Sequence, residues 1–413
     1  MVAGRWALTS AMAAVVLGLG PGGPDHDAGA RLTKPTSVTL DFRDRPVGEV
    51  VKAIEARSGK RVTAHGNFTK SAIGGFRLGG PADMSWRDRT VTLEAPEPVP
   101  FWEAIDRLAV AGRMAYRVGD YGDSTGVDFG GNGDAPSPAC YAGPFRVGLL
   151  GVHEHREVIF VRGPWVRFYP SGVPAPADAA DLTEAPKDGG TLYAELGVAA
   201  EPGLVCRRDG PLKGLEAVGE GGRSLLAQAK EDVRQTVQAF ASIDGGITPT
   251  VRVPLKRVEG GGGRSVKTLR GVIPLEVGAL KPEPAVVIRL GDAGGKVFRG
   301  GGAVFTVETD RTEPDGRRKL ALSCRLSGDM DPAVREARLA ALRTYQIRVV
   351  DARGAPASFA STGSGGDGRG ALSFTYEYVP GQQPSEPPAE FRYYDLDRTA
   401  WQVPFEFRDI PLP

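Results

Sequence analysis

A pattern of strand, amphipathic helix and strand occurs twice near the start of the 413-residue chain. It limits the fold more than any other feature. The first copy is SVTLDFRDRPVGEVVKAIEARSGKRVTAHG, 37–66, and the second is TVTLEAPEPVPFWEAIDRLAVAGRMAYRVG, 90–119. Pro46 is placed to open the first helix, and Gly59 and Gly112 are placed to end the two helices. The pattern predicts two βαβ units that pack together between residues 37 and 118.

Apolar residues in this region alternate in the strands and recur at helical spacing between them. In the first copy we expect one apolar face from each element, and the second copy repeats the arrangement. The positions that we expect to form this core are Val38, Leu40, Phe42, Val47, Val50, Val51, Ile54, Val91, Leu93, Phe101, Ala104, Ile105 and Leu108.

The doubled unit, VTLDFRDRPVGEVVKAIEARSG in particular, resembles the secretin and TonB short N-terminal (STN) domain. The resemblance covers 37–118 and implies a docking module that partner proteins contact in the cell envelope. It implies no catalytic residue. Nothing downstream has the pattern of a secretin pore or of a transmembrane barrel with regularly spaced strands. The whole chain resembles an exported protein of planctomycete type.

The N-terminal segment, 1–30, has the features of a secretory signal peptide. Arg5 precedes an apolar run that extends to Leu19, and Ala28-Gly29-Ala30 fits a cleavage site. We therefore expect an exported protein, periplasmic or extracellular. No later run approaches 18 apolar residues, so we expect no integral membrane segment in the mature chain. The net charge of +1, with acids and bases interspersed, argues against nucleic-acid binding.

The remainder of the chain is dominated by short strand patterns bounded by turn residues. The Gly- and Asp-rich stretch 119–143 reads as a flexible linker. We place one β-sandwich at 144–291 and a second at 294–413. The predicted fold class is α+β, with a small βαβ-βαβ module followed by mainly-β, Ig-like sandwich domains. RTEPDGRR, 311–318, predicts a hairpin with Pro-Asp-Gly at its tip.

Two helices are expected to interrupt these strands, one within 226–240 and one within 331–343. The three cysteines are too few and too widely spaced for a disulfide scaffold or a zinc cluster. Cys206 and Cys324 alternate with leucines, which predicts small buried residues of a core. A pairing of Cys140 with Cys206 stays open.

Two motifs raise the question of catalysis or metal binding. GDSTG, 122–126, matches the nucleophile elbow of hydrolases, but it lacks the strand and helix that this motif needs on its flanks. We interpret it as a chance match. His153 and His155 lie on one face of a strand and are able to hold a transition metal. No third ligand is evident, so a solvated polar face is the preferred interpretation.

The same Gly-rich stretch carries oxygen ligands that suit Ca²⁺. They are Asp120, Asp123, Asp128, Asn132 and Asp134. Their spacing fits neither an EF-hand loop nor a nonapeptide repeat, so a solvated linker is preferred over a calcium site. The glycine runs 260–263 and 300–302 lack the Lys-Ser/Thr of a phosphate loop and read as turns.

Aromatic residues form two candidate binding clusters. The first contains Trp165, Phe168 and Tyr169, and the second contains Tyr393, Tyr394 and Trp401. Each fits a sugar platform or a protein hot spot, and each equally fits side chains that cover the end of a sandwich. Asn67 begins a formal glycosylation motif that we expect to be unused in a bacterium.

No residue is assigned as catalytic, cofactor-binding or metal-binding. The leading hypothesis is an exported, non-enzymatic protein of the cell envelope, in which 37–118 docks a protein partner and the sandwiches act as a spacer or second binding surface. The alternative is an extracellular carbohydrate-binding or hydrolytic protein built on β-sandwiches.

Overall fold

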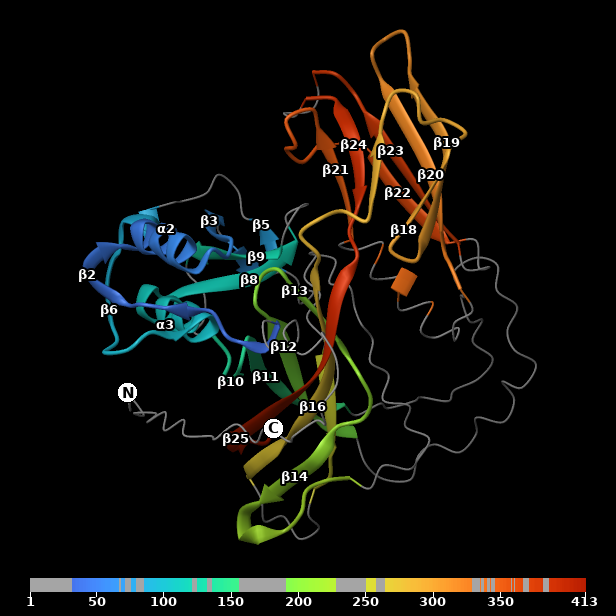
Figure 1. Cartoon of the computed structure of the whole chain (residues 1–413). Coiled ribbons are helices and arrows are strands. Elements are labelled where there is room, and N and C mark those ends of the chain that lie inside the picture. Colours follow the sequence, from blue (N-terminus) through green and yellow to red (C-terminus); the bar gives the residue numbers. More distant parts are fainter. Residues whose placement is uncertain are drawn as a thin grey trace, which may run out of the picture.

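The computed structural model is mainly β, with several separate sheets and two well-formed helices among the described residues (Figure 1). The structure describes residues 32–66, 68–70, 76–78, 85–120, 125–131, 136–155, 191–227, 250–257, 264–328, 335, 338–339, 342, 346–357, 359, 361–366, 371–381 and 386–413. Within these ranges, no helix is both long and apolar enough to cross a membrane. The expected signal peptide, 1–30, and Asn67 lie outside the described residues.

The N-terminal unit contains both helices, each within the segment predicted for it. Its elements are β1 (Ser37–Val38), β2 (Asp41–Pro46), α2 (Val47–Ser58), β3 (Val62–Gly66), β4 (Phe68–Lys70), β5 (Phe76–Leu78), the 3-10 helix η1 (Ser85–Asp88), β6 (Thr90–Glu94), β7 (Val99–Pro100), α3 (Phe101–Gly112), β8 (Met114–Asp120) and β9 (Thr125–Gly131). All of the apolar positions predicted for the core are buried here, and Trp86, Trp102 and Phe129 join them.

The strands of this unit pair across its two halves. β2 pairs with β6 and β1 with β7, both antiparallel. β3 and β8 do not pair with each other, because β9 lies between them, parallel to β3 and antiparallel to β8. β9, together with β10 (Ala139–Ala142), falls within the predicted linker, 119–143. The linker prediction is therefore wrong for these residues, whose apolar members Val127 and Phe129 are buried in the core.

The two helices end in different ways. Gly59 follows α2 in the left-handed conformation, with φ of 64°, and its N–H donates to the carbonyl of Glu55, as predicted. For α3 the prediction of Gly112 is wrong by one residue. Arg113 adopts the left-handed conformation, with φ of 51°. Gly112 stays helical, and a Cβ there would lie 2.7 Å from Cε of Met114.

The middle sandwich is built from two sheets that share one apolar core. The first sheet has the order β10-β11-β12-β15, with β11 (Phe145–His155), β12 (Thr191–Ala200) and β15 (Thr250–Leu255). The second contains β13 (Leu204–Arg208), β16 (Ser265–Leu280), β14 (Lys213–Gly219) and β25 (Leu396–Pro411), with β16 at its centre. The 3-10 helix η3 (Glu220–Gly222) follows β14. Buried residues of both sheets form the core.

The third unit is a second pair of sheets around a separate core. One sheet has the order β17-β24-β21, formed by β17 (Val286–Arg289), β24 (Pro388–Tyr393) and β21 (Ile347–Asp351). The other has the order β18-β19-β20-β23-β22, formed by β18 (Val297–Gly300), β19 (Ala303–Thr312), β20 (Arg318–Leu326), β23 (Ala371–Tyr378) and β22 (Ser361–Gly366). β19 and β20 form the predicted hairpin, with Gly316 at φ of 81° in its turn.

The two predicted sandwich boundaries do not match this arrangement. β17 lies within 144–291 but belongs to the third unit, and β25 lies within 294–413 but pairs with β16 along its length. Leu280 pairs with Leu396, so 286–393 is an insertion between two paired strands. The connections stay side by side, because Lys281 N–H donates to the carbonyl of Asp395 at 2.9 Å. Figure 1 shows the orange and red unit leaving the middle sandwich at this point.

Of the two helices predicted outside the N-terminal unit, one is described in part. Residues 335, 338, 339 and 342 are helical, and Leu339 and Leu342 are buried in the core of the third unit. Residues 228–249, which contain most of the other predicted helix, lie outside the described residues.

Candidate binding groove between two edge strands

A groove opens in the third unit where the edges of its two sheets face each other. Among the described strands, β17 pairs only with β24, and β18 pairs only with β19. The two edge strands approach closely at one end, where a Cβ on Gly300 would collide with the carbonyl of Ala285 and the side chain of Val286. Glycine at position 300 therefore permits the contact. The strands are joined at their other end by 290–296.

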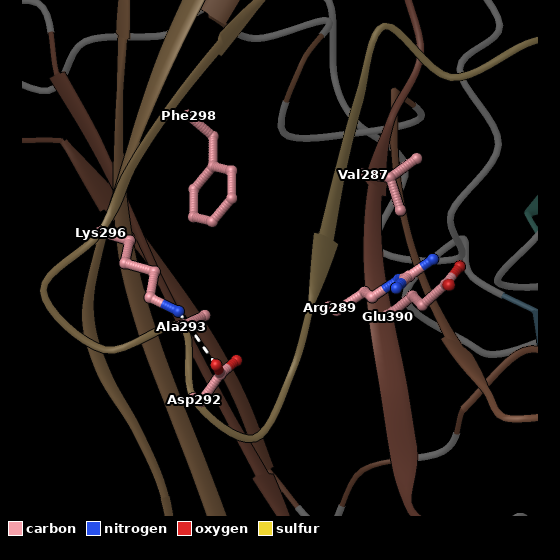
Figure 2. A pocket seen from close by; sticks show the side chains of 7 residues that line it. All are labelled: Val287, Arg289, Asp292, Ala293, Lys296, Phe298 and Glu390. Carbon is pink, nitrogen blue, oxygen red and sulfur yellow. Dashed lines mark hydrogen bonds and ion pairs between the residues drawn. The ribbon is translucent and has the colours of Figure 1, made fainter.

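The groove has a volume of about 530 Å³ and a lining of mixed chemistry. Its residues are Val287, Arg289, Asp292, Ala293, Lys296, Phe298 and Glu390. Figure 2 shows Phe298 and Lys296 on one side and Arg289 and Glu390 on the other, with Asp292 and Ala293 in the loop between them. Phe298 is half-buried and supplies the aromatic surface of the groove.

Charges in and beside the groove are unequally paired. Lys296 Nζ lies 3.0 Å from Asp292 Oδ2, and Arg392 lies 2.7 Å from Glu390. Both carboxylates are thereby neutralised by neighbours. Arg289 on β17 is exposed and makes no ion pair within the part of the chain that the structure describes. The lining itself contains two basic side chains, Arg289 and Lys296, and two acidic ones, Asp292 and Glu390.

Buried carboxylates elsewhere bind donors of the chain itself. Asp106, on α3, accepts hydrogen bonds from the hydroxyl of Tyr116, from the hydroxyl of Tyr141 at 2.6 Å and from Arg146 Nε at 2.8 Å. Tyr141 and Arg146 belong to β10 and β11 of the middle sandwich. Burial and the Asp106 carboxylate raise the pKa of Tyr116 and of Tyr141 well above the usual range, so both phenols stay protonated donors.

A second buried carboxylate joins the same two units. Glu201, 2% exposed, accepts a hydrogen bond from the backbone N–H of Thr36 at 2.9 Å and one from its hydroxyl at 2.6 Å. Lys60 lies 3.6 Å from the same carboxylate and donates to the carbonyl of Pro202 at 3.1 Å. Hydrogen bonds and ion pairs of Asp106 and of Glu201 therefore join the N-terminal unit to the middle sandwich.

The catalytic motifs considered from the sequence do not assemble a site in the described residues. Ser124 of GDSTG lies outside them, and residues 125–131 after it form a strand rather than a helix. His153 lies on the outer face of the first middle sheet, stacked on Tyr193 with ring centroids 5.3 Å apart, and its Nε2 lies 3.4 Å from Glu195. The side chain of His155 is not among those described.

The predicted calcium ligands are also dispersed. Asp123, Asn132 and Asp134 lie outside the described residues, as does the side chain of Asp120. Asp128 is in β9, 1% exposed, and accepts a hydrogen bond from the Thr63 hydroxyl at 3.0 Å. No three His, Cys, Asp or Glu residues among the described ones are grouped to hold a metal ion. Of the predicted glycine turns, 300–302 joins β18 to β19, and 260–263 is outside the described residues.

Only one of the two predicted aromatic clusters lies within the described residues. Trp165, Phe168 and Tyr169 lie outside the described residues. Tyr393 and Tyr394 are buried, and the Tyr393 hydroxyl donates to the carbonyl of Gly301 at 3.2 Å. Trp401 packs against the core of the middle sandwich. For this second cluster the structure favours the interpretation that the side chains cover sandwich surfaces.

The three cysteines are free. Cys206 and Cys324 are buried in the two sandwich cores, as predicted. Burial raises the pKa of Cys140 to about 11 and those of Cys206 and Cys324 to about 12. A thiol with such a pKa is almost entirely protonated at neutral pH and is a poor nucleophile.

Sequence reasoning missed the groove, because its lining residues come from strands whose pairing the sequence does not reveal. The alternation of exposed and buried residues in PAVVIRL was a usable signal, since it places Val287 and Arg289 together on an exposed face. Comparison of the chain with protein-family models, with curated proteins and with solved structures gives no match. The resemblance to the STN domain therefore depends on the sequence pattern alone.

Proposed function

We propose that the protein is an exported, non-enzymatic component of the cell envelope that binds other polypeptides. In this proposal the N-terminal unit is a βαβ-βαβ docking module of STN type, and the Ig-like sandwiches hold it at a distance or offer a second binding surface. The proposal includes export by the segment 1–30 to the periplasm or the extracellular space.

The observation that carries the proposal is the position of β2 and β6. Among the described strands these two pair only with each other, and Figure 1 shows them on the side of the unit that faces away from the sandwiches. Phe42 and Leu93 point into the core, whereas Arg43, Arg45 and Thr92 are exposed. Each strand of this two-stranded sheet has one edge with no described strand beside it, and charged side chains on its exposed face. Such a surface on the outer side of the unit suits contact with a protein partner.

The chemistry of the described side chains supports a binding role. The buried carboxylates there include Asp106, Asp128, Glu201, Asp310 and Asp351, and each accepts hydrogen bonds from the chain's own donors. A general acid or base needs a free position beside the reacting atoms. Asp106 and Glu201 use these hydrogen bonds to join two units, whereas Asp128 and Asp351 use them within one unit.

The test is site-specific photo-crosslinking of the full chain in cells that export it. A photoreactive phenylalanine analogue replaces Arg45 on β2, and a matched variant carries it at Glu308 on β19, which is also exposed. We expect a discrete adduct with one protein from position 45 and none from position 308. An absence of adducts at position 45, or the same adduct from both positions, would contradict docking through this unit.

Carbohydrate binding is the second candidate, and the groove of the third unit is the observation that favours it. Its volume of about 530 Å³, its half-buried Phe298 and its polar rim are features of sugar sites. Hydrolysis is less well supported, because Asp292 and Glu390 are each paired with a basic side chain. Glycan-array binding that is lost in Phe298→Ala would favour this candidate over protein docking.

A further inference from the structure

We propose that the groove of the third unit, together with the outer face of the sheet β17-β24-β21, binds an acidic polysaccharide. A neutral sugar would lie in the groove, and the carboxylate of an adjacent sugar would lie against arginines on the sheet. The proposal rests on the carbohydrate-binding candidate described above and names its ligand. It is independent of the docking surface on β2 and β6. It commits to a polysaccharide, so binding of an acidic peptide at this site counts against it.

The groove itself suits the neutral part of a sugar. Its lining has two basic and two acidic side chains around the half-buried ring of Phe298 (Figure 2). Hydroxyl groups both donate and accept hydrogen bonds, so a sugar ring needs donors and acceptors together. Arg289 and Lys296 supply donors, and Asp292 and Glu390 supply acceptors. The lining by itself selects no charge.

The outer face of the sheet continues the groove across three strands. Residues directly opposite each other on neighbouring antiparallel strands have their side chains on the same face. Val287, which lines the groove, lies opposite Arg392 on β24, and Arg392 lies opposite Arg348 on β21. In the next row, Arg289 lies opposite Glu390. The arginines therefore lie on a surface that begins in the groove.

Positive charge exceeds negative charge on this face. The outward side chains of the three strands include three arginines and one carboxylate, that of Glu390. The carboxylate is already paired, since Arg392 Nη2 lies 2.7 Å from Glu390 Oε2. Arg289 and Arg348 make no ion pair with a described residue, and the Arg348 guanidinium lies 5.0 Å from the centroid of the Tyr394 ring. Two guanidinium groups thus lack a counter-charge among the described residues.

The position of Arg348 opposite Arg392 carries the proposal. Like charges directly opposite each other destabilise a sheet, and neighbouring strands are only about 4.8 Å apart. A carboxylate between the two guanidinium groups would offset the repulsion and accept hydrogen bonds from both. A peptide of acidic residues offers carboxylates but no hydroxyl-bearing ring for the groove. The groove and the arginines together therefore favour a polysaccharide that carries carboxylates.

The experiment uses the full chain and a defined probe, a fluorescently labelled hexasaccharide of hyaluronan, in which glucuronic acid alternates with a neutral sugar. The same hexasaccharide with every carboxylate methyl-esterified is the matched uncharged ligand. We expect saturable binding of the acid by fluorescence anisotropy at low salt. The ester should bind about tenfold more weakly, because it lacks the charge-assisted hydrogen bonds.

Three variants locate the site. Arg348→Gln should weaken binding of the acid to the level of the ester and leave binding of the ester unchanged. Phe298→Ala should weaken binding of both ligands. Arg325→Gln, at an exposed position on the other sheet of the same unit, is the matched control and should change neither.

Binding of the ester by Arg348→Gln shows that this variant is folded, so that its lost preference for the acid reports on Arg348. The proposal is overturned if the acid does not bind, binds no better than the ester, or keeps its advantage in Arg348→Gln. Equal binding of acid and ester that is lost in Phe298→Ala would leave the carbohydrate candidate in place without this inference. Arg348-dependent binding of labelled hexaglutamate that is tighter than binding of the acid would assign the site to an acidic peptide and overturn the proposal.

Discussion

Buried polar residues join parts of this chain that are far apart in the sequence. Asp106 and Arg146 are 40 positions apart, and Thr36 and Glu201 are 165 positions apart. A charge removed from water is costly unless it is paired and hydrogen-bonded, and these charges are. Gly148 belongs to the same arrangement, because a Cβ there would collide with the guanidinium of Arg146. The residues fix one position of the N-terminal unit on the middle sandwich.

Replacement of Asp106 by Asn tests this role. Asn keeps the size of the side chain but leaves Arg146 buried without a counter-charge. Breaking one partner of a buried pair typically costs about 3 kcal/mol of unfolding free energy. We expect a loss of that order in urea unfolding followed by tryptophan fluorescence, to which buried Trp86 and Trp102 contribute. Glu103→Gln, on the same helix but partly exposed, should change stability by no more than about 0.5 kcal/mol. Equal effects of both substitutions would contradict the assignment.

The thiols give a prediction for pH. A folded-state pKa of about 11 for Cys140, against an ordinary value of 9.0, lowers the thiolate fraction at pH 8 by about a hundredfold. Alkylation by iodoacetamide should therefore be slow in the native protein and should accelerate as the pH rises toward 11. In guanidinium chloride all three cysteines should react at the rate of free cysteine. If a cysteine of the native protein reacts at the rate of free cysteine at pH 8, its thiol is not buried, and the prediction is contradicted.

At the scale of elements, the ends of α2 and α3 show where the rule that a glycine ends a helix holds and where it fails. Gly59 takes the left-handed conformation at no steric cost, as its position after α2 predicts. The same rule fails at Gly112, because Met114 packs over the glycine and the left-handed position falls on Arg113. For a residue other than glycine, that conformation typically costs about 1 to 2 kcal/mol of conformational energy.

The two helices therefore respond in opposite ways to substitution. Arg113→Gly should stabilise the protein by about 1 kcal/mol, since glycine adopts the left-handed conformation freely. Gly59→Ala should destabilise it by a similar amount, because it places a Cβ at φ of 64°. Thermal unfolding of both variants beside the parent protein is the measurement. A decrease in stability for Arg113→Gly would indicate that the arginine side chain contributes more than its strain costs.

At the scale of the whole molecule, the third unit is an insertion with its own core. Among the described residues, its buried apolar side chains form a cluster separate from the core of the middle sandwich. The chain enters and leaves the unit through adjacent connections. The middle sandwich tolerates the insertion because β16 and β25 remain paired up to Leu280 and Leu396, where the insertion begins and ends.

Excision of the insertion tests this description. Replacing 281–395 by Asn-Gly joins Leu280 to Leu396 through a two-residue turn of the kind that suits antiparallel strands. We expect the shortened protein to fold, with strand content by circular dichroism and a cooperative thermal transition. The excised segment 281–395 should fold alone and keep the groove. A shortened protein that aggregates while the full chain stays monomeric would show that the units depend on each other.

Much of the local structure was predictable from the sequence. The apolar positions of the N-terminal core, the segments of α2 and α3, the hairpin at Pro314-Asp315-Gly316 and the burial of Cys206 and Cys324 follow from spacing over two to four residues. The candidate groove did not follow, because it combines two edge strands with a residue of β24, about 90 positions away. The insertion of β9 beside β3 escaped prediction for the same reason.

The sequence by itself determined which residues face a core, because alternation and helical periodicity record burial directly. Only the tertiary structure decided which strand each one pairs with. The same alternating segment is compatible with many neighbours, and the choice depends on packing and pairing across the whole fold. Thus Val403, Phe405 and Phe407 lie within the predicted second sandwich, 294–413, whereas β25 places them in the core of the middle one. The units, their boundary and the open edge of β17 all result from that long-range choice.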